Sequence, residues 1–579
     1  MSSTYYLTTS GNNTFAYFQA MAAGDYTYVA SGVNLFGGNL NGNGDGIYDT
    51  ANGIVEIAGT LIGANTIYMT GATSTTTYFQ VDAGGKVVTS YAGDYAFRLD
   101  NGAYNITNNG AISALISPNY SYGIYLGNNT ASGTILNNGS INSAGFAIGD
   151  INLTRSNQDT IYNYGQIFGT AGAIYANQDV ITIYNYGTIG SQDTWGYDSG
   201  KGGAITSLGS LNLYNYGQIT GGVYCNYLGL LNNFGTIQGN VYLQTSGAGA
   251  GVSNSGTING NVVLANYSDL KDSGTITGVV SLTSGSIELS NAQTLVSGGG
   301  DTVTFETGAN NAVTLAGNAA WDNVLGSDGT VNLAGAYSGV VGGGDTVNFV
   351  GSTTDSASLW NTTNNWDTVN GANGTIYLSH AIASVVGAAN TVNFTTGTDN
   401  IASLWNTANT FDSVNGSNNT VDLSDAYANV IGGGDMIDFT YGSANIASLF
   451  NTGGAADTVV NGAGSGTLYI NNAQANVTGN GDTIDFTGAG TDIVTISGNN
   501  ETFITQPISG AEQVLGFNSS DQIDLSAAQF GSSYAIFAAN DITQAGGNTY
   551  IIDPSNHANV LVLVGVSATN LSASNVHFG

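Results

Sequence analysis

The chain has 579 residues, including 86 Gly and only three Pro, and it carries five Lys or Arg against 38 Asp or Glu. The formal net charge of −33 leaves no basic surface for nucleic acid and disfavours an anionic membrane surface. A single cysteine, Cys225, excludes an intrachain disulfide framework, and we expect it to be a buried small residue. No apolar run is long enough for a spanning helix, so we predict no membrane insertion.

Residues 1–54 precede the regular repeats and predict an N-terminal cap or assembly segment. The stretches 4–9 and 14–18 are uncharged and rich in β-forming residues. Such strands are poor caps for the end of a solenoid, because an exposed strand edge pairs readily with another chain. We therefore expect this segment to pair with a second copy by strand addition. The contact would run head to tail and propagate rather than close as a dimer.

The same segment contains a candidate calcium loop. Oxygen-bearing side chains alternate here, with Gly46 at the sixth position, as in the first half of an EF-hand loop. The expected ligands are Asn41, Asn43, Asp45 and Asp49. The twelfth position holds Asn52 rather than a bidentate Glu, so a plain polar turn stays open as the alternative.

Residues 55–297 contain a short repeated phrase: an aliphatic residue, any residue, Asn or Asp, any residue, Gly, any residue and Ile. Eight copies occur, and their Gly residues are 110, 139, 165, 187, 217, 235, 256 and 274. A phrase recurring at roughly twenty residues is a unit that must stack on copies of itself, so we predict a β-helix.

The fixed positions of the phrase share one face of a strand, because side chains alternate with a period of two. The inward Asn of successive turns should form a hydrogen-bonded ladder, which Asp272 ends; its Asn members are 108, 137, 163, 185, 215, 233 and 254. Aromatic residues fill the outward positions, including Tyr164, Tyr186 and Tyr216. They are interpreted either as stacking along the solenoid or as a contact surface for a subunit or glycan.

Residues 298–500 change to a period near 45, with about five short strands in each repeat. The repeats carry Asp or Asn after a glycine-rich corner, and they also carry aromatic residues at fixed places. The corner positions are 301, 345, 390, 435 and 482, and the aromatic markers include Trp321, Trp366, Trp360 and Trp405. The pattern predicts a second solenoid segment. Helix should be scarce, since no segment holds a sustained helical period.

Two stretches of this half carry a family resemblance. The corner sequences ending in Asp345 and Asp482 resemble degenerate forms of the glycine- and aspartate-rich nonapeptides of RTX proteins. Residues 511–526, and the apolar stretches between 548 and 579, are similar to the closing segment and uncleaved C-terminal secretion signal of serralysin-type, type I-secreted proteins. Residues 501–579 are therefore assigned as a C-terminal cap and secretion signal. Residues 55–297 resemble the β-helices of autotransporter adhesins.

The resemblance implies export to the cell surface or the extracellular medium, which fits the absence of a recognisable N-terminal signal. It also implies calcium at Asp301, Asp345, Asp435 and Asp482. The RTX repeat, however, places a residue between its second Gly and the Asp, whereas Gly344 and Asp345 are adjacent here. Glycine–aspartate corners that cap strands are the alternative interpretation.

Catalysis on a β-helix uses clustered carboxylates, often with Arg or Lys beside them. The only Arg residues are Arg98 and Arg155, and no nucleophile elbow, zinc motif or phosphate loop occurs. We therefore predict that the chain is not an enzyme, with a polysaccharide-active β-helix enzyme as the remote alternative.

The fold class predicted from these patterns is all-β, a parallel β-solenoid in which a β-helix is followed by RTX-like, β-roll-type repeats. The predicted function is that of a secreted, self-assembling structural protein, the subunit of a surface layer or an extracellular filament. The alternative is an adhesin that binds glycans or surfaces. The expected partners are other copies of the chain and, in the second case, a cell-surface polysaccharide.

Overall fold

The structure is a computed structural model. It describes residues 3–579 except 14–16, 22–23, 38–44, 50–52, 71–75, 90, 92–93, 117–120, 151–157, 178–179, 193–202, 245–248, 307, 309, 318–319, 352–353, 361–364, 406–409, 451–453, 462–464, 489 and 509. Within strands, the side chains of 12–13, 17–21, 45, 49, 128–130 and 150 are also outside the description.

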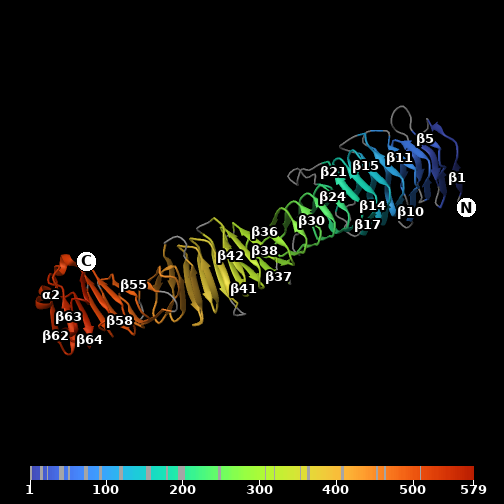
Figure 1. Cartoon of the computed structure of the whole chain (residues 1–579). Helices are drawn as coiled ribbons and strands as arrows, with labels where there is room; N and C mark the ends of the chain where they lie inside the picture. Colours follow the sequence, from blue (N-terminus) through green and yellow to red (C-terminus); the bar gives the residue numbers. More distant parts are fainter. Residues whose placement is uncertain are drawn as a thin grey trace. The chain divides into compact units, whose positions relative to one another are not determined.

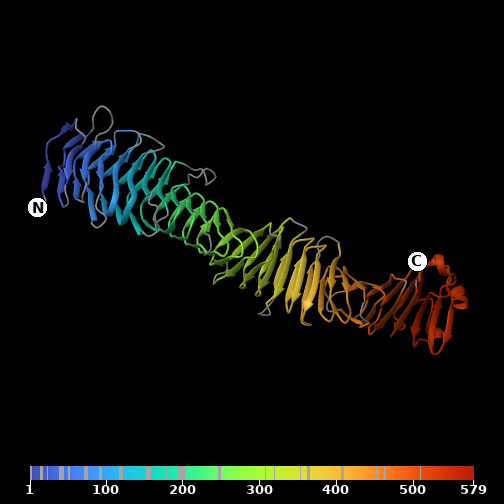
Figure 2. The same ribbon diagram turned by 180° about the vertical axis from the view of Figure 1, so that it is seen from behind.

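The fold is a parallel β-solenoid, as the repeats predicted. About 22 turns are present in all, with 60% of residues in strands and 3% in helices. The chain divides into two compact units, Met1–Asn311 and Ala312–Gly579. The sequence had placed the change of repeat at residue 298. Within each unit, strands of successive turns stack side by side (Figures 1 and 2).

Over most of the first unit, each turn of the solenoid has three strands. Strands β17 (Gln158–Asn163), β18 (Gln166–Gly169) and β19 (Gly172–Ala176) make up one such turn. Each pairs in parallel with the strand three places further on. The ladder that contains β18 ends at β33 (Thr275–Ile276), and the turns after β33 have two strands. The sequence pattern had required at least two strands in each turn.

The inward Asn residues form the predicted ladder. Each side-chain amide donates to the Asn carbonyl of the next turn, over 2.7–2.8 Å from Asn108 to Asn254. Asn254 then donates to Asp272 over 2.9 Å. Because every amide points toward the C-terminal end, the last member needs only to accept. This explains why the eighth copy can carry Asp where the others carry Asn.

The repeated Gly of the phrase is required by the close approach of successive turns. A Cβ atom on Gly187 would lie 2.1 Å from the carbonyl oxygen of Gly165, and one on Gly217 would meet Gly187 in the same way. No side chain fits there without separating the turns. Thus the Asn and the Gly of the phrase both serve the contact between turns.

In the second unit a turn has two strands, and strand pairing therefore joins elements two places apart. Strands β39 (Asp322–Leu325), β41 (Tyr337–Val341), β43 (Ser356–Trp360), β45 (Thr375–Ser379) and β47 (Thr391–Thr396) form one ladder. Strands β44 (Asp367–Asn370), β46 (Ile382–Val386), β48 (Ile401–Trp405) and β50 (Thr420–Ser424) belong to the other.

This arrangement has a consequence for the 45-residue repeat. A repeat contains five strands, for example β43 to β47, whereas a turn contains two. Since five is odd, each repeat begins on the ladder opposite to the one before it. Equivalent residues of neighbouring repeats therefore lie on opposite sheets, as Trp360 in β43 and Trp405 in β48 do.

The C-terminal end of the second unit is covered. Strand β64 (Val560–Val564) adds to β60 (Ala511–Leu515) in parallel, and β63 (Asn548–Ile552) then pairs with it antiparallel. Strand β62 (Ile542–Ala545) pairs with β63. Helix α2 (Tyr534–Asn540) brings Phe537 against Phe578 of β65 (Val576–Phe578), with ring centroids 5.5 Å apart. An antiparallel meander and a helix thus close the parallel stack.

At the N-terminal end, the residues expected to form a cap or assembly segment include turns of the same solenoid. Strand β1 (Thr4–Leu7) pairs in parallel with β4 (Tyr26–Val29), which pairs with β7 (Ile54–Ile57). Val29, Leu35 and Ile47 lie fully buried. The alternation of polar and apolar residues in these short strands is the same as in later turns, so they extend the core rather than cover it.

Candidate functional site

The expected calcium loop near the N-terminus is only partly within the description. Asn41 and Asn43 lie outside the described residues. Asp45 and Asp49 begin and end strand β6, but their side chains are not described. The prediction for these four residues therefore stays a prediction.

The four corner aspartates of the 45-residue repeats are buried, and all four accept the same kind of hydrogen bond. Asp345 accepts a hydrogen bond from the backbone N–H of Gly329 over 2.9 Å, and Asp435 accepts one from Asn419 over 2.9 Å. Asp301 and Asp482 make the same contact, with N–H groups 16 residues earlier, over 2.8 and 3.1 Å. Each carboxylate thus caps the preceding turn.

A second row of buried acids continues this pattern. Asp367 accepts from the N–H of Asp345 over 3.0 Å, and Asp457 accepts from that of Asp435 over 3.0 Å. Asp412 and Glu501 occupy equivalent places beside Asn390 and Asp482, over 2.8 and 2.7 Å. In each case the backbone N–H of a corner residue is therefore held by the side chain of an acid further along the chain.

Six of these eight carboxylates have one oxygen buried without a hydrogen-bond partner among the described atoms; they are those of Asp345, Asp367, Asp412, Asp435, Asp457 and Glu501. Burial away from water disfavours the charged form. It raises the pKa of Asp345 and Asp435 to about 6. It raises the pKa of Asp367, Asp412, Asp457 and Glu501 to about 7.

The described residues include no group of three or more His, Cys, Asp and Glu side chains arranged to hold a metal ion. The corner aspartates each direct one oxygen at a backbone N–H, which matches the strand-capping alternative. Calcium at Asp301, Asp345, Asp435 and Asp482 stays a prediction.

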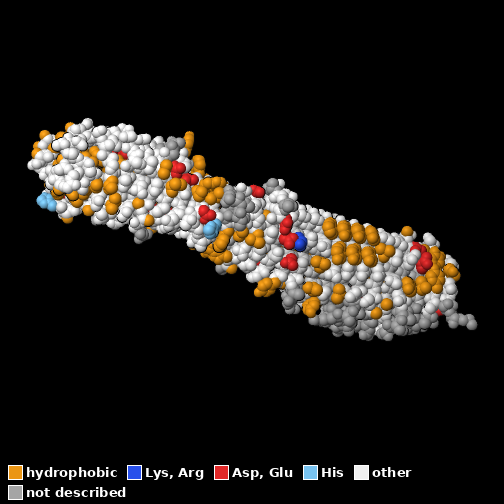
Figure 3. Space-filling model, turned by 90° about the horizontal axis from the view of Figure 1, so that it is seen from below, with side chains coloured by type: hydrophobic (Ala, Val, Ile, Leu, Met, Phe, Trp, Pro, Cys, Tyr) orange, Lys and Arg blue, Asp and Glu red, His pale blue; other side chains and the backbone are white. Residues whose placement is uncertain are grey.

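The outward aromatic residues of the first unit stack along the solenoid. One column contains Tyr164, Tyr186, Tyr216 and Phe234, and the other contains Tyr162, Tyr184 and Tyr214. Neighbouring ring centroids lie 4.8–5.0 Å apart with planes within 4–9° of parallel. Figure 3 shows hydrophobic side chains gathered in rows on one face of the molecule. Within a column the ring faces cover one another, so the column presents ring edges outward.

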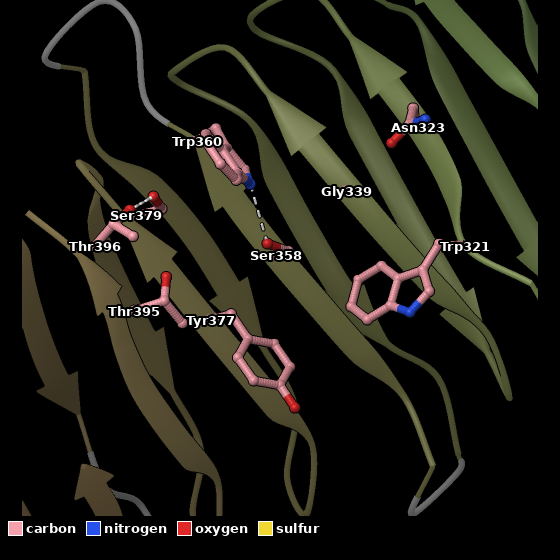
Figure 4. Close-up of a pocket in the computed structure, with 9 residues that line it drawn as sticks. All are labelled: Trp321, Asn323, Gly339, Ser358, Trp360, Tyr377, Ser379, Thr395 and Thr396. Carbon is pink, nitrogen blue, oxygen red and sulfur yellow. Dashed lines mark hydrogen bonds between the residues drawn. The ribbon is translucent and has the colours of Figure 1, made fainter. Parts of the chain in front are cut away.

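A groove of different character lies on one sheet of the second unit (Figure 4). Its volume is about 480 Å³, within the range typical of ligand pockets. Trp321, Trp360 and Tyr377 supply aromatic surface, and Trp321 and Trp360 are exposed over 43% and 50% of their area. The remaining lining residues are small or carry hydroxyl or amide groups: Asn323, Gly339, Ser358, Ser379, Thr395 and Thr396. No lining side chain is charged.

Hydrogen bonds hold parts of the groove in place. The indole N–H of Trp360 donates to the hydroxyl of Ser358 over 3.1 Å. The hydroxyls of Ser379 and Thr396 bond to one another. The plane of Trp321 makes an angle of 61° with that of Tyr377, at a centroid distance of 6.3 Å. These rings are not stacked face to face, in contrast to the tyrosine columns.

The floor of the groove is Gly339. It lies beside Asn323 on one neighbouring strand and Ser358 on the other. A Cβ atom there would approach Asn323 Oδ1 to 3.0 Å. The next two repeats have Ser384 and Asn429 at this position. A missing side chain in one repeat therefore helps to form the hollow.

Sequence reasoning had found Trp321 and Trp360 only as markers of the repeat. The available signal was the break in the repeat at Gly339, but its meaning depends on which residues face the same side.

Cys225, expected to be a buried small residue, is 1% exposed, and burial raises the pKa of its thiol.

Comparison with known protein families and with curated proteins finds no match to this chain. Among the described residues, no helix has the length and apolar character needed to cross a membrane.

Proposed function

We propose that this chain is a self-assembling structural protein of the bacterial cell surface or extracellular matrix, in which copies join head to tail through the open edge of β1. The observation that carries the proposal is the contrast between the two chain ends. Strand β1 pairs only with β4 among the described residues, so one edge has no neighbour. At the C-terminal end, the ladder through β60 and β64 ends instead in two antiparallel strands, β63 and β62, and β62 is the outer one.

The direction of the backbone groups in β1 follows from two hydrogen bonds. The N–H of Tyr26 donates to the carbonyl of Ser3 over 2.9 Å, and that of Ala30 donates to Leu7 over 3.0 Å. Since backbone groups alternate sides along a strand, those of Thr4 and Tyr6 face the open edge. An unpaired row of this kind is a template for another strand. At the other end of a neighbouring copy, the outer strand is β62, which pairs only with β63 among the described residues.

Tyr6→Pro is expected to prevent assembly while leaving the turn intact. Proline lacks the N–H that faces the open edge, and it is tolerated on an edge strand when that N–H faces solvent. Tyr6→Ala removes the exposed side chain but keeps the donor, and it serves as the matched control. Negative-stain microscopy should show polymers for the natural chain and the Ala variant, and single particles for Tyr6→Pro. Polymers of equal length in all three would refute this interface.

Mixing separates a head-to-tail contact from a contact between two N-terminal ends. The Tyr6→Pro chain keeps its β62 edge, so it should add to the open β1 end of a growing polymer and stop it. Addition of one variant chain to ten natural chains should then shorten the polymers. If their length is unchanged, β62 is not the partner of β1.

Export is proposed to depend on the C-terminal segment, on the strength of its resemblance to type I secretion signals. Deletion of residues 548–579 should leave the protein inside the cell, measured by immunoblotting of cells and medium. The deletion also removes β63, β64 and β65, so a fusion of the segment to an unrelated folded protein is the complementary test. Export of the deleted chain, or failure of the segment to export its fusion partner, would contradict the proposal.

The second candidate function is that of an adhesin that binds a surface polysaccharide. The groove lined by Trp321, Trp360 and Tyr377 favours it, because aromatic and hydroxyl groups of this kind suit a ligand rather than the packing of turns. A filament subunit can also carry such a groove, so the two functions are compatible.

A further inference from the structure

The groove of the second unit lacks charge in a chain of high negative charge. Its nine lining residues include no Asp, Glu, Lys, Arg or His. The chain as a whole carries a formal net charge of −33. An anionic ligand would be repelled by that field, and a cationic ligand would find no carboxylate in the lining to pair with. The electrostatics of the groove therefore favour a neutral ligand.

The lining also combines two kinds of surface that a neutral sugar requires. The apolar C–H faces of a pyranose pack against aromatic rings, and its hydroxyls exchange hydrogen bonds with hydroxyl and amide groups. Trp321, Trp360 and Tyr377 supply the rings, while Asn323, Ser379 and Thr395 are among the polar groups beside them. The tyrosine columns of the first unit do not offer this arrangement, because their ring faces cover one another.

From these observations we infer that the groove bounded by Trp321, Trp360 and Tyr377 binds a neutral polysaccharide of hexopyranose units. The site goes beyond the assembly proposal and does not depend on it, since β1 contributes no residue to it. Trp360 packs against a sugar ring, with its indole N–H held by Ser358. Gly339 leaves the space in which the ring lies.

The repeat supplies an internal control for this site. The equivalent residues of the next repeat are Trp366, Ser384, Trp405 and Asp422. The last three lie in strands of the opposite sheet, and Trp366 directly precedes β44 of that sheet. Trp405 is 44% exposed, close to the 50% of Trp360. However, Ser384 fills the place of Gly339, and Asp422 brings a carboxyl group to the place of Tyr377. Trp405→Ala thus matches Trp360→Ala in exposure and repeat position but alters a surface without the groove's composition.

The test is calorimetric titration of the full chain with maltohexaose, cellohexaose and laminarihexaose, beside hexagalacturonate and chitosan hexamer as charged probes. We expect at least one neutral hexasaccharide to bind with a Kd between about 1 μM and 1 mM, and the charged probes to bind at least about tenfold more weakly. Trp360→Ala should weaken binding at least about tenfold, and Trp405→Ala less than about twofold.

Gly339→Asn is a second variant, which places at the floor of the groove the residue type found at the equivalent position, Asn429, two repeats further on. It should also weaken binding at least about tenfold. Far-UV circular dichroism checks that each variant keeps its strands. Repeating the titration with Tyr6→Pro separates the two proposals, since that variant should bind the sugar without assembling. Failure of all three neutral probes to bind, or equal losses in the Trp360 and Trp405 variants, would overturn the assignment.

Discussion

Asp345→Asn is expected to stabilise the second unit at pH 8 by about 1–3 kcal/mol. The substitution removes a buried charge and replaces the carboxylate oxygen that has no hydrogen-bond partner with an amide that donates. Asn390, the equivalent residue of the next repeat, shows the geometry. Its carbonyl accepts from the N–H of Gly374 over 3.1 Å, and its amide donates to the carbonyl of Gly371 over 3.1 Å. Gly329 and Gly326 occupy the corresponding places around Asp345.

The gain should depend on pH in a defined direction. Burial raises the pKa of Asp345 from 3.8 to about 6 in the folded chain. The folded state therefore binds this proton more tightly than the unfolded state. The stabilisation that comes from protonation of Asp345 is complete below pH 3.8 and is lost as pH rises through about 6. Asp345→Asn should thus raise the melting temperature at pH 8 and change it little at pH 4.

The other buried acids act in the same direction. The pKa of Asp367, Asp412, Asp457 and Glu501 is raised to about 7. The natural chain should therefore melt at a higher temperature at pH 5 than at pH 8, as measured by calorimetry. Asp399→Asn is the control, since Asp399 has a side chain 68% exposed and its replacement should change little. A lower melting temperature at pH 5 would contradict the assignment of these groups as buried and destabilising when charged.

Asn185→Ala is expected to destabilise the first unit by about 3 kcal/mol, the effect of interrupting the ladder at its middle. Asn185 accepts from Asn163 and donates to Asn215, each over 2.8 Å, and it also donates to the carbonyl of Gln218 over 3.2 Å. Its removal leaves the amide of Asn163 and the carbonyl of Asn215 buried with fewer partners. Urea unfolding followed by tyrosine fluorescence measures the change.

Asn232→Ala is the matched control for the ladder. Asn232 lies in β26 (Gly229–Asn233), next to the ladder residue Asn233, but its side chain points outward. Its replacement should change the free energy of unfolding by less than about 0.5 kcal/mol. Equal effects of the two substitutions would show that the ladder contributes no more than any surface amide.

The ladder was predictable because its signal is local. A period of two assigns the Asn, the Gly and the Ile of each phrase to one face, and the spacing between phrases brings the Asn residues into register. The common direction of the amides was not predicted, although Asp272 at the final position pointed to it. Only the completed ladder shows that its last member needs no donor.

The corner aspartates and the groove depend on longer-range geometry. Whether Asp345 faces a cation or a backbone N–H is decided by the turn before it, where Gly329 lies 16 residues earlier in the chain. Predicting the groove requires knowing that Gly339 and Trp360 share a sheet, that Trp321 directly precedes the neighbouring strand β39, and that Trp405 lies on the opposite sheet. This alternation between sheets follows only from the combination of five strands in a repeat with two strands in a turn.

Sedimentation velocity of the full chain over a range of concentrations, with and without millimolar calcium, tests the proposed function most directly. The head-to-tail account predicts species that grow steadily in size with concentration, while the Tyr6→Pro variant sediments as a monomer under the same conditions. Calcium should increase the size of the species if it bridges the acidic chains. A natural chain that sediments as a monomer at every concentration, with or without calcium, would contradict assembly and leave the groove as the main functional surface.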